Sequence, residues 1–265
     1  MNHAAVNPNA RSMPELLLVA KKLSKRFGGL QALSEVSFSI CKGDIYGLIG
    51  PNGAGKTTLF NLITGETPAD SGRIEFAGKD IARLKPHEIV RRGVSRTLQI
   101  KSVFGGLTVV DNIRAAVLTH RRIMAPFRLV SSFASVSART DELIEEVGLT
   151  GHHQTLASAL SYGDVALLEM ALALAAEPKL LLLDEPICGM GPQETERAVA
   201  MIKRIAKRVD VILIEHDMEV VFDIADFIMV MAQGGILATG TATEIASNLD
   251  VQEAYLGSPE DELAC

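Results

Sequence analysis

Cysteine is scarce in this sequence, which has three among its 265 residues. Cys41, Cys188 and Cys265 lie far apart along the chain and form no C-x-x-C pair. This spacing excludes zinc-binding and thioredoxin-like redox motifs, which need closely spaced cysteines. Three unpaired thiols also suit a reducing compartment, where disulfides rarely form. We therefore expect a fold that its hydrophobic core stabilises without disulfides or a structural metal.

Long hydrophobic runs and a secretion signal are missing as well. The most apolar stretch, residues 165–183, is interrupted by two glutamates, a proline and a lysine, and so falls short of the roughly 18 apolar residues of a membrane-spanning helix. The apolar stretch after Pro14 is too short for a signal peptide. The sequence predicts a protein that does not cross a membrane by itself.

The remaining composition is that of a globular protein. Hydrophobic residues make up 48% of the chain and charged residues 22%, which excludes disordered, collagenous and disulfide-scaffold classes. The 26 basic and 32 acidic residues give a net charge of −6, which argues against a nucleic-acid binder that works by bulk charge. The sequence shows no internal repeat, and its length allows one large domain or two small ones.

Apolar patterning divides the chain into regions of different character. A polar tail, residues 1–14, precedes a region with β-strand patterns that extends to about residue 75. Residues 100–160 have helical patterns, and from Ser161 helices alternate with apolar strands, which predicts a parallel sheet covered by helices. Strands are expected at 36–40, 45–49, 180–184, 210–214 and 227–231, and helices at 57–64, 109–122, 141–147, 163–176, 192–208 and 218–225.

A glycine-rich motif follows the apolar run that ends at Ile49. Residues 50–57, GPNGAGKT, match the complete phosphate-binding pattern G-x-x-x-x-G-K-T between an expected strand and an expected helix. Glycines let backbone N–H groups surround phosphate oxygens, and the helix N-terminus adds its dipole. In this motif Lys56 reaches the β- and γ-phosphates and the Thr57 hydroxyl binds Mg²⁺. The flanking strand and helix argue against a chance glycine turn.

Two carboxylates follow a run of four leucines, residues 180–183. Asp184 and Glu185 therefore emerge at the C-terminal end of a buried strand, where ligands bind in open α/β sheets. An acidic strand end is often only structural, but here a phosphate-binding loop precedes it. We expect Asp184 to hold Mg²⁺, and Glu185 to act as the general base or to polarise the attacking water.

Between these two motifs, residues 160–164 have the sequence LSYGD and open an expected helix. This segment resembles the LSGGQ-type signature of ATP-binding-cassette (ABC) ATPases. Phe27, Gln99 and His216 are similar in position to the family's adenine-stacking aromatic residue, Q-loop glutamine and switch histidine. Residues 188–191 lie where the family has its D-loop. Taken singly, each residue has an ordinary explanation as a core aromatic, a surface amide or a structural histidine; their common order favours the family.

The resemblance implies an α/β fold with a phosphate-loop NTPase core, an antiparallel β subdomain and an inserted α-helical subdomain at about residues 100–162. The ABC domain is expected at 15–257, between a flexible N-terminal tail, 1–14, and a C-terminal tail, 258–265. Binding of ATP and Mg²⁺ and hydrolysis of ATP are also implied. In this family two subunits work as a dimer, and each nucleotide lies between the phosphate loop of one subunit and the signature of the other.

The resemblance also assigns residues to roles. Nucleotide contacts are implied for Phe27, Gly50, Pro51, Asn52, Gly53, Ala54, Gly55, Lys56, Thr57, Thr58, Ser161 and Gly163; Mg²⁺ ligation for Thr57, Gln99 and Asp184; and catalysis for Glu185, His216 and Gln99. Ser161 and Gly163 are expected to contact the γ-phosphate. His216 would fix the attacking water, and Gln99 would link the nucleotide state to the helical subdomain.

Further segments resemble one subfamily. SRTLQ at 95–99, IEHDMEVVF at 214–222 and VQEAYLGS at 251–258 are similar to ATP-binding subunits of branched-chain amino-acid importers, most of all to the larger of their two ATPase subunits. This implies a peripheral protein at the cytoplasmic face of the inner membrane, bound to transmembrane permease subunits. A second ATP-binding subunit, identical or different, and indirectly a periplasmic or extracellular solute-binding protein are further implied partners; nucleic acid is not. Urea or amide importers, lipopolysaccharide exporters and non-transport ABC proteins remain alternatives.

Some features depart from the family pattern. Asp164 replaces the last signature residue, which is commonly Gln, and Gly191 stands where many ABC proteins have Asp. Because Ser161 and Gly163 are present, we expect hydrolysis to be retained, while these departures weaken the expectation of efficient, symmetric turnover. Segment 112–140 has five arginines and no acidic residue, and is expected to face membrane subunits or anionic lipid headgroups; a solvated basic surface is the alternative.

Overall fold

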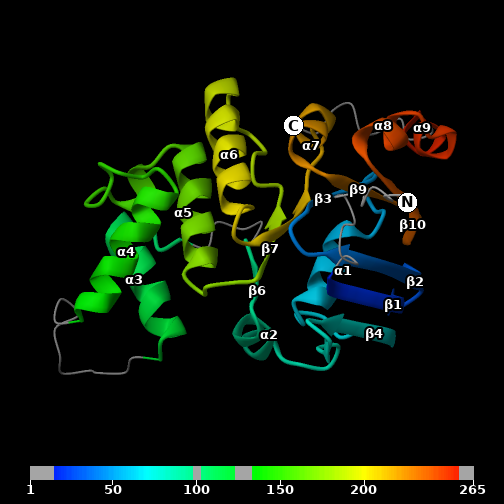
Figure 1. Ribbon diagram of the computed structural model, residues 1–265, viewed down its shortest axis with the longest axis horizontal. Coiled ribbons are helices and arrows are strands. Elements are labelled where there is room, and N and C mark those ends of the chain that lie inside the picture. Colours follow the sequence, from blue (N-terminus) through cyan, green and yellow to red (C-terminus); the bar gives the residue numbers. More distant parts are fainter. Residues whose placement is uncertain (1–14, 98–102, 123–132, 257–265) are drawn as a thin grey trace, which may run out of the picture.

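The computed structural model describes residues 15–97, 103–122 and 133–256 (Figure 1). Within these ranges the strands form two sheets, an antiparallel one in the order β2–β1–β4–β5 and a larger one in the order β10–β9–β3–β8–β7–β6. The strands are β1 Leu16–Phe27, β2 Leu30–Cys41, β3 Ile45–Ile49, β4 Ser71–Phe76, β5 Lys79–Asp80, β6 Val94–Arg96, β7 Leu180–Asp184, β8 Asp210–Ile214, β9 Phe227–Ala232 and β10 Gly235–Gly240. The helices are α1 Lys56–Ile63, α2 Pro86–Arg92, α3 Val109–His120, α4 Ala134–Glu146, α5 Tyr162–Leu174, α6 Pro192–Ile205, α7 Met218–Ile224, α8 Ala242–Ala246 and α9 Leu249–Leu256.

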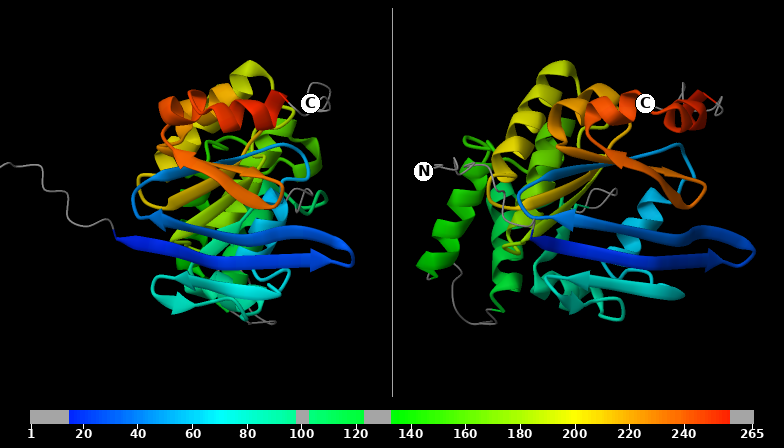
Figure 2. Two further views of the ribbon diagram at one scale, coloured as in Figure 1. Left: turned by 90° about the vertical axis from the view of Figure 1, so that its right-hand side faces the viewer. Right: turned by 45° about the vertical axis from the view of Figure 1, so that its right-hand side comes forward.

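The antiparallel sheet is buried on one side and exposed on the other. In β2, Val36 and Ile40 are buried while Ser37 and Ser39 are exposed, so the expected half-buried strand is confirmed. The buried side packs with α1 against one face of the larger sheet. Figure 2 shows this hairpin layer, drawn in blue, beside the yellow and orange strands of the larger sheet.

The larger sheet is covered on both faces. Leu181 and Leu183 of β7 join the core that α5 and α6 supply, whereas Leu180 and Leu182 face α1 and the antiparallel sheet. Strands buried on both faces have no polar alternation, and β3 and β7 are buried at every position. The strands expected at 45–49, 180–184 and 210–214 are confirmed with these bounds.

Helices α3 and α4 pack beside α5, at the end of the molecule away from β1 and β2 (Figure 1). The helix expected at 141–147 is wrong in its start, because α4 begins at Ala134. Val136 and Thr140 are buried on the same helix face as Leu143 and extend the buried face toward the N-terminus. The bounds of an inserted helical subdomain stay a prediction. In the part of the chain that the structure describes, no helix is long and apolar enough to span a bilayer.

The neighbouring strands β3, β8 and β7 run parallel, so their C-terminal ends meet at one edge of the sheet. The glycine-rich loop leaves β3 there, Asp184 ends β7, and Glu215 and His216 follow β8. In open α/β sheets ligands bind at this edge. The fold therefore brings the glycine-rich loop, Asp184 and His216 to the same edge of the sheet.

Candidate functional site

The glycine-rich loop, residues 50–57, packs closely against its neighbours. Gly50 has φ 147°, and a Cβ there would lie 2.1 Å from the carbonyl oxygen of Met231 in β9. Gly55 has φ 105°, and a Cβ there would lie 2.8 Å from the carbonyl oxygen of Ala32 in β2. Only glycine fits both the backbone angles and the available space. The loop is therefore held in shape by both sheets before any ligand binds.

Lys56 begins α1 and is 7% exposed. Its ammonium group donates hydrogen bonds to the carbonyl oxygens of Gly50 and Pro51, the second at 3.2 Å. A nearly buried cation needs polar partners, and these carbonyls belong to the loop itself. Phosphate is a stronger partner for an ammonium than a carbonyl. The loop thus holds a cation beside the helix N-terminus, an arrangement that fits a bound phosphate group.

Asp184 is 4% exposed at the end of β7. Its Oδ2 accepts a hydrogen bond from Arg96 at 2.6 Å, whereas Oδ1 is buried without a hydrogen-bond partner in the described ranges. Burial raises the pKa of this carboxyl above its ordinary value, and the bond from Arg96 acts in the opposite direction. A buried oxygen without a partner is costly, and Mg²⁺ prefers such oxygen ligands. The site fits Mg²⁺ at Oδ1.

Protein ligands alone do not complete a metal site here. Among the described residues, no group of three or more His, Cys, Asp and Glu side chains is arranged to hold a metal ion. Mg²⁺ bound through one carboxylate commonly takes its other ligands from phosphate oxygens and water. The geometry therefore fits a metal that arrives with a nucleotide.

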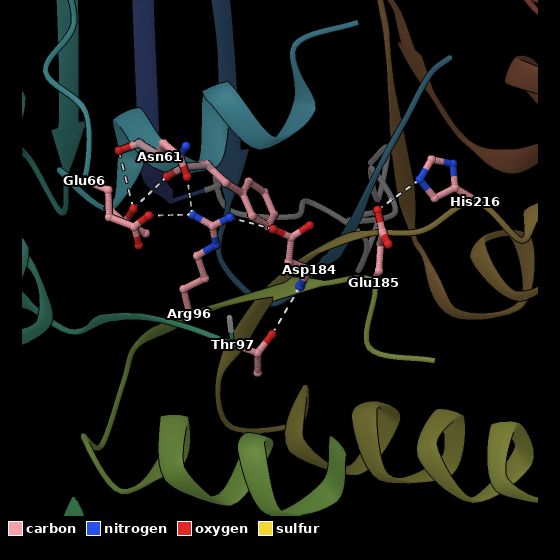
Figure 3. Close-up of polar contacts among 9 residues, drawn as sticks. Asn61, Glu66, Arg96, Thr97, Asp184, Glu185 and His216 are labelled. Carbon is pink, nitrogen blue, oxygen red and sulfur yellow. Dashed lines mark hydrogen bonds and ion pairs between the residues drawn. The ribbon is translucent and has the colours of Figure 1, made fainter. Parts of the chain in front are cut away.

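Arg96 lies at the centre of a buried polar network (Figure 3). From β6 its guanidinium donates to Asn61 Oδ1 at 2.6 Å and Asp184 Oδ2 at 2.6 Å, and it pairs with Glu66 at 3.3 Å. Its side chain is 6% exposed and lies over the Phe60 ring at 5.6 Å. The arginine thus links α1, which follows the glycine-rich loop, to the carboxylate at the end of β7.

Glu185 and His216 lie together on the other side of this edge (Figure 3). His216 Nε2 is 3.1 Å from Glu185 Oε1, which is hydrogen-bonding distance. Glu185 has φ 51°, in the left-handed region, while its N–H still donates to the carbonyl oxygen of Ile214 at 2.9 Å. A non-glycine residue in this region is strained. The backbone is bent just after β7, and the catalytic carboxylate predicted from the sequence contacts the predicted switch histidine.

Glu215 is a buried carboxyl beside these two residues. It is 3% exposed, and it accepts hydrogen bonds from the N–H of Ile187 at 2.9 Å and of His216 at 3.3 Å. Burial raises its pKa from 4.5 to about 7, although both hydrogen bonds lower it. Glu215 joins the segment after β8 to the segment after Glu185. Its protonation therefore affects the support of both predicted catalytic residues.

Of the other residues predicted to contact the nucleotide, Phe27 lies at the surface and Gln99 lies outside the described ranges. Phe27 ends β1, is 49% exposed, and has the Lys25 ammonium 5.4 Å from its ring centre. It is therefore half-exposed and not a core residue. Gln99 lies outside the described residues, but Thr97, two residues before it, accepts a hydrogen bond from the N–H of Asp184 at 3.2 Å.

The signature segment lies at the start of α5. Ser161 caps the helix by accepting a hydrogen bond from the N–H of Asp164 at 3.1 Å, and Gly163 is buried. Their polar contacts reach α6, where Ser161 donates to Glu194 at 3.0 Å and Asp164 pairs with Arg197 at 3.4 Å. The signature thus contacts α6 and not the glycine-rich loop of its own chain.

Comparisons with known proteins agree with this geometry. The ABC transporter family profile matches residues 33–188, and a second profile, of branched-chain amino acid ATP-binding cassette transporters, matches residues 236–261. The chain belongs to the ABC transporter family of ATPases.

Two curated ABC proteins show how far the similarity extends. The chain is 39% identical over 256 residues to the high-affinity branched-chain amino acid transport ATP-binding protein BraF of Pseudomonas aeruginosa, with 92% of this chain and 99% of that protein covered. It is 38% identical over 257 residues to LivG of Escherichia coli K12, with the same shares covered. A crystal structure of a nucleotide-free ATP-binding cassette from an ABC transporter has TM-score 0.82 and 30% identity, and covers 92% of this chain and 100% of its own. The similarity therefore extends over almost the whole ABC chain.

Sequence reasoning missed two ABC-site residues that the structure shows. Arg96 stands three residues before Gln99, and only the pairing of β6 with β7 brings it to Asp184. Glu215 directly precedes His216, and its burial depends on the packing of α7 and of the segment after Glu185. The sequence signal for Arg96 was a basic residue close to Gln99. The signal for Glu215 was an acidic residue directly after an apolar strand.

Replacement of Arg96 by methionine should lower the free energy of unfolding by about 3–5 kcal/mol, because it leaves the buried Asp184 carboxylate uncompensated. Urea unfolding followed by circular dichroism measures this change. The double variant Arg96→Met with Asp184→Asn removes both charges and should recover part of the loss. If the double variant is as unstable as the sum of the two single ones, Arg96 does not balance Asp184.

Replacement of Glu215 by glutamine should remove a pH-dependent part of the stability. The pKa is raised on folding, from 4.5 to about 7, so the contribution of Glu215 is complete below pH 4.5 and is lost as the pH rises through 7. Relative to the wild type, the variant should therefore gain on the order of 3 kcal/mol between pH 4.5 and pH 8. Melting temperatures across this range measure it, and parallel profiles would contradict the predicted shift.

Proposed function

We propose that this chain is the ATP-hydrolysing subunit of an importer for branched-chain or related amino acids. The observation that carries the hydrolytic part is the common edge of β3, β8 and β7, where the glycine-rich loop, the buried Asp184 oxygen and the Glu185–His216 pair meet. The substrate class is supported by the profile match at residues 236–261 and by the names of both curated relatives.

Each predicted residue has a task in this proposal. Lys56 holds the β- and γ-phosphates, and Thr57, Asp184 and Gln99 hold Mg²⁺, which when bound neutralises charge on the phosphate oxygens. Glu185 accepts a hydrogen bond from the attacking water and takes up its proton. His216, 3.1 Å from Glu185, holds that carboxylate and the water in line. Phe27 offers its exposed ring face to the adenine.

A second copy or a related ATPase subunit completes each site in this proposal. Ser161 and Gly163 stand at the N-terminus of α5 and contact α6 of their own chain. A helix N-terminus that presents a hydroxyl and backbone N–H groups binds anions well. The signature of one subunit can therefore close over the γ-phosphate bound in the glycine-rich loop of the other.

The permease contact belongs, in the same proposal, to a cavity of about 400 Å³ between α2, α3 and α5. Its lining is mostly apolar and includes Phe104, 64% exposed, while His87, Arg91 and Arg122 add basic groups. A permease helix with apolar side chains and acidic or carbonyl groups at one end fits this combination. Docking there places the subunit at the cytoplasmic face of the membrane, with the solute-binding protein on the far side of the permease.

Replacement of Lys56 by alanine should weaken ATP binding at least about tenfold, because a charge-assisted contact to the phosphates is lost. Binding of a fluorescent ATP analogue to the purified chain measures this loss. Lys79→Ala is a suitable control, since Lys79 is an exposed lysine on β5. Equal affinities of the wild type and both variants for the ATP analogue would contradict a role of Lys56 in nucleotide binding.

Replacement of Glu185 by glutamine should leave ATP binding intact and slow hydrolysis at least about 100-fold, because the general base is removed. Phosphate release measures the rate, and Glu253→Gln, an exposed position on α9, is the matched control. In a strain that lacks this chain, the wild type should restore leucine uptake and Glu185→Gln should not. Restored uptake by the variant would contradict its role, and no uptake with the wild type would contradict the substrate class.

A further inference from the structure

The carboxylate of Glu194, in the first turn of α6, lies directly over the N-terminus of α5. Its Oε1 accepts a hydrogen bond from the Ser161 hydroxyl at 3.0 Å, and its Oε2 accepts one from the N–H of Gly191 at 3.3 Å. A Cβ on Gly163 would lie 2.8 Å from Oε1. The carboxylate is thus seated on the two signature residues that the proposed function assigns to the γ-phosphate.

The contacts stabilise the charged form of the Glu194 carboxylate. Its pKa is held below its ordinary value by the N–H of Gly191, by the Ser161 hydroxyl and by the N–H of Gly163. These donors surround a negative charge in the way that a helix N-terminus surrounds a phosphate group. Glycine at position 163 is required for this approach, because a side chain would meet the carboxylate.

The Ser161 hydroxyl can serve only one anion at a time. A hydroxyl group has one proton to donate, and its lone pairs are used here to accept the N–H of Asp164 at 3.1 Å. The proton is donated to Glu194. A γ-phosphate oxygen that takes this hydrogen bond must therefore replace the Glu194 oxygen, and two anions in one place would also repel each other.

We infer that Glu194 occupies the γ-phosphate position on the signature of the separate subunit and is displaced when an ATP-loaded partner closes over it. The inference rests on the proposed function of Ser161 and Gly163. The carboxylate keeps a partner when it leaves, because Oε2 remains on the N–H of Gly191 while Oε1 turns away. The Asp164–Arg197 pair meanwhile continues to hold α5 to α6.

Titration with inorganic phosphate tests the inference without any partner subunit. The backbone amide signal of Gly163 is followed by NMR in the full chain, in Glu194→Ala and in Glu196→Ala, which removes an exposed charge from the same helix. Glu194→Ala should respond at a phosphate concentration about tenfold lower than the other two, the scale of one charge-assisted hydrogen bond. Equal responses in all three proteins, including no response in any, would overturn the inference. Glu194→Gln, which keeps the side-chain size, replaces Glu194→Ala if the latter does not fold.

Dimerisation provides the second measurement. Light scattering follows the mass of Glu185→Gln, alone or combined with Glu194→Ala or with Glu196→Ala, as ATP and Mg²⁺ are added. Loss of the Glu194 carboxylate should lower the ATP concentration needed for the dimer about tenfold, whereas a higher requirement would overturn the inference and show that Glu194 supports the closed state. Failure of the proposed function looks different: the chain then binds no ATP at all, while the phosphate titration still decides the role of Glu194.

Discussion

The buried end of β7 is the constraint on which the candidate site depends. Asp184 must be buried because β7 lies between β6 and β8 in a sheet covered on both faces. A carboxylate in that position needs a cation, and Arg96 provides one through only one of the two oxygens. The same burial leaves Oδ1 without a hydrogen-bond partner among the described residues, which fits the Mg²⁺ ligand role that we propose for Asp184.

The charges at this edge are balanced by few cations. Asp184 is paired with Arg96, Glu185 Oε1 lies 3.1 Å from His216 Nε2, and burial raises the pKa of Glu215 to about 7. An approaching triphosphate adds negative charge to this group, so its binding must bring or engage further positive charge. Lys56, whose ammonium donates to carbonyl oxygens of its own loop, is a cation of the glycine-rich loop that a phosphate group can engage.

Local sequence predicted the buried strands at 45–49, 180–184 and 210–214 with the observed bounds, because continuous apolar runs depend on neighbouring residues, whereas β4, β5 and β10 were not predicted. The start of α4 was missed where the apolar pattern is sparse. Arg96 and Glu194 could not be assigned, since their partners lie on strands and helices that only the tertiary fold brings close. Gln99 stays a prediction. The residues that could be predicted are thus those whose motifs have a characteristic spacing along the chain. The residues that were missed make side-chain contacts between separate helices and strands.

The unusual signature residue Asp164 has a structural explanation in the same terms. Its carboxylate pairs with Arg197 on α6, one turn after Glu194, which binds Ser161. Two contacts with charged side chains therefore join α5 to α6. One is the hydrogen bond from Ser161 to Glu194, and the other is the ion pair between Asp164 and Arg197. If only the first must break when phosphate arrives, the second keeps the helices in register during the exchange. Asp164 then holds the start of α5 against α6 through Arg197.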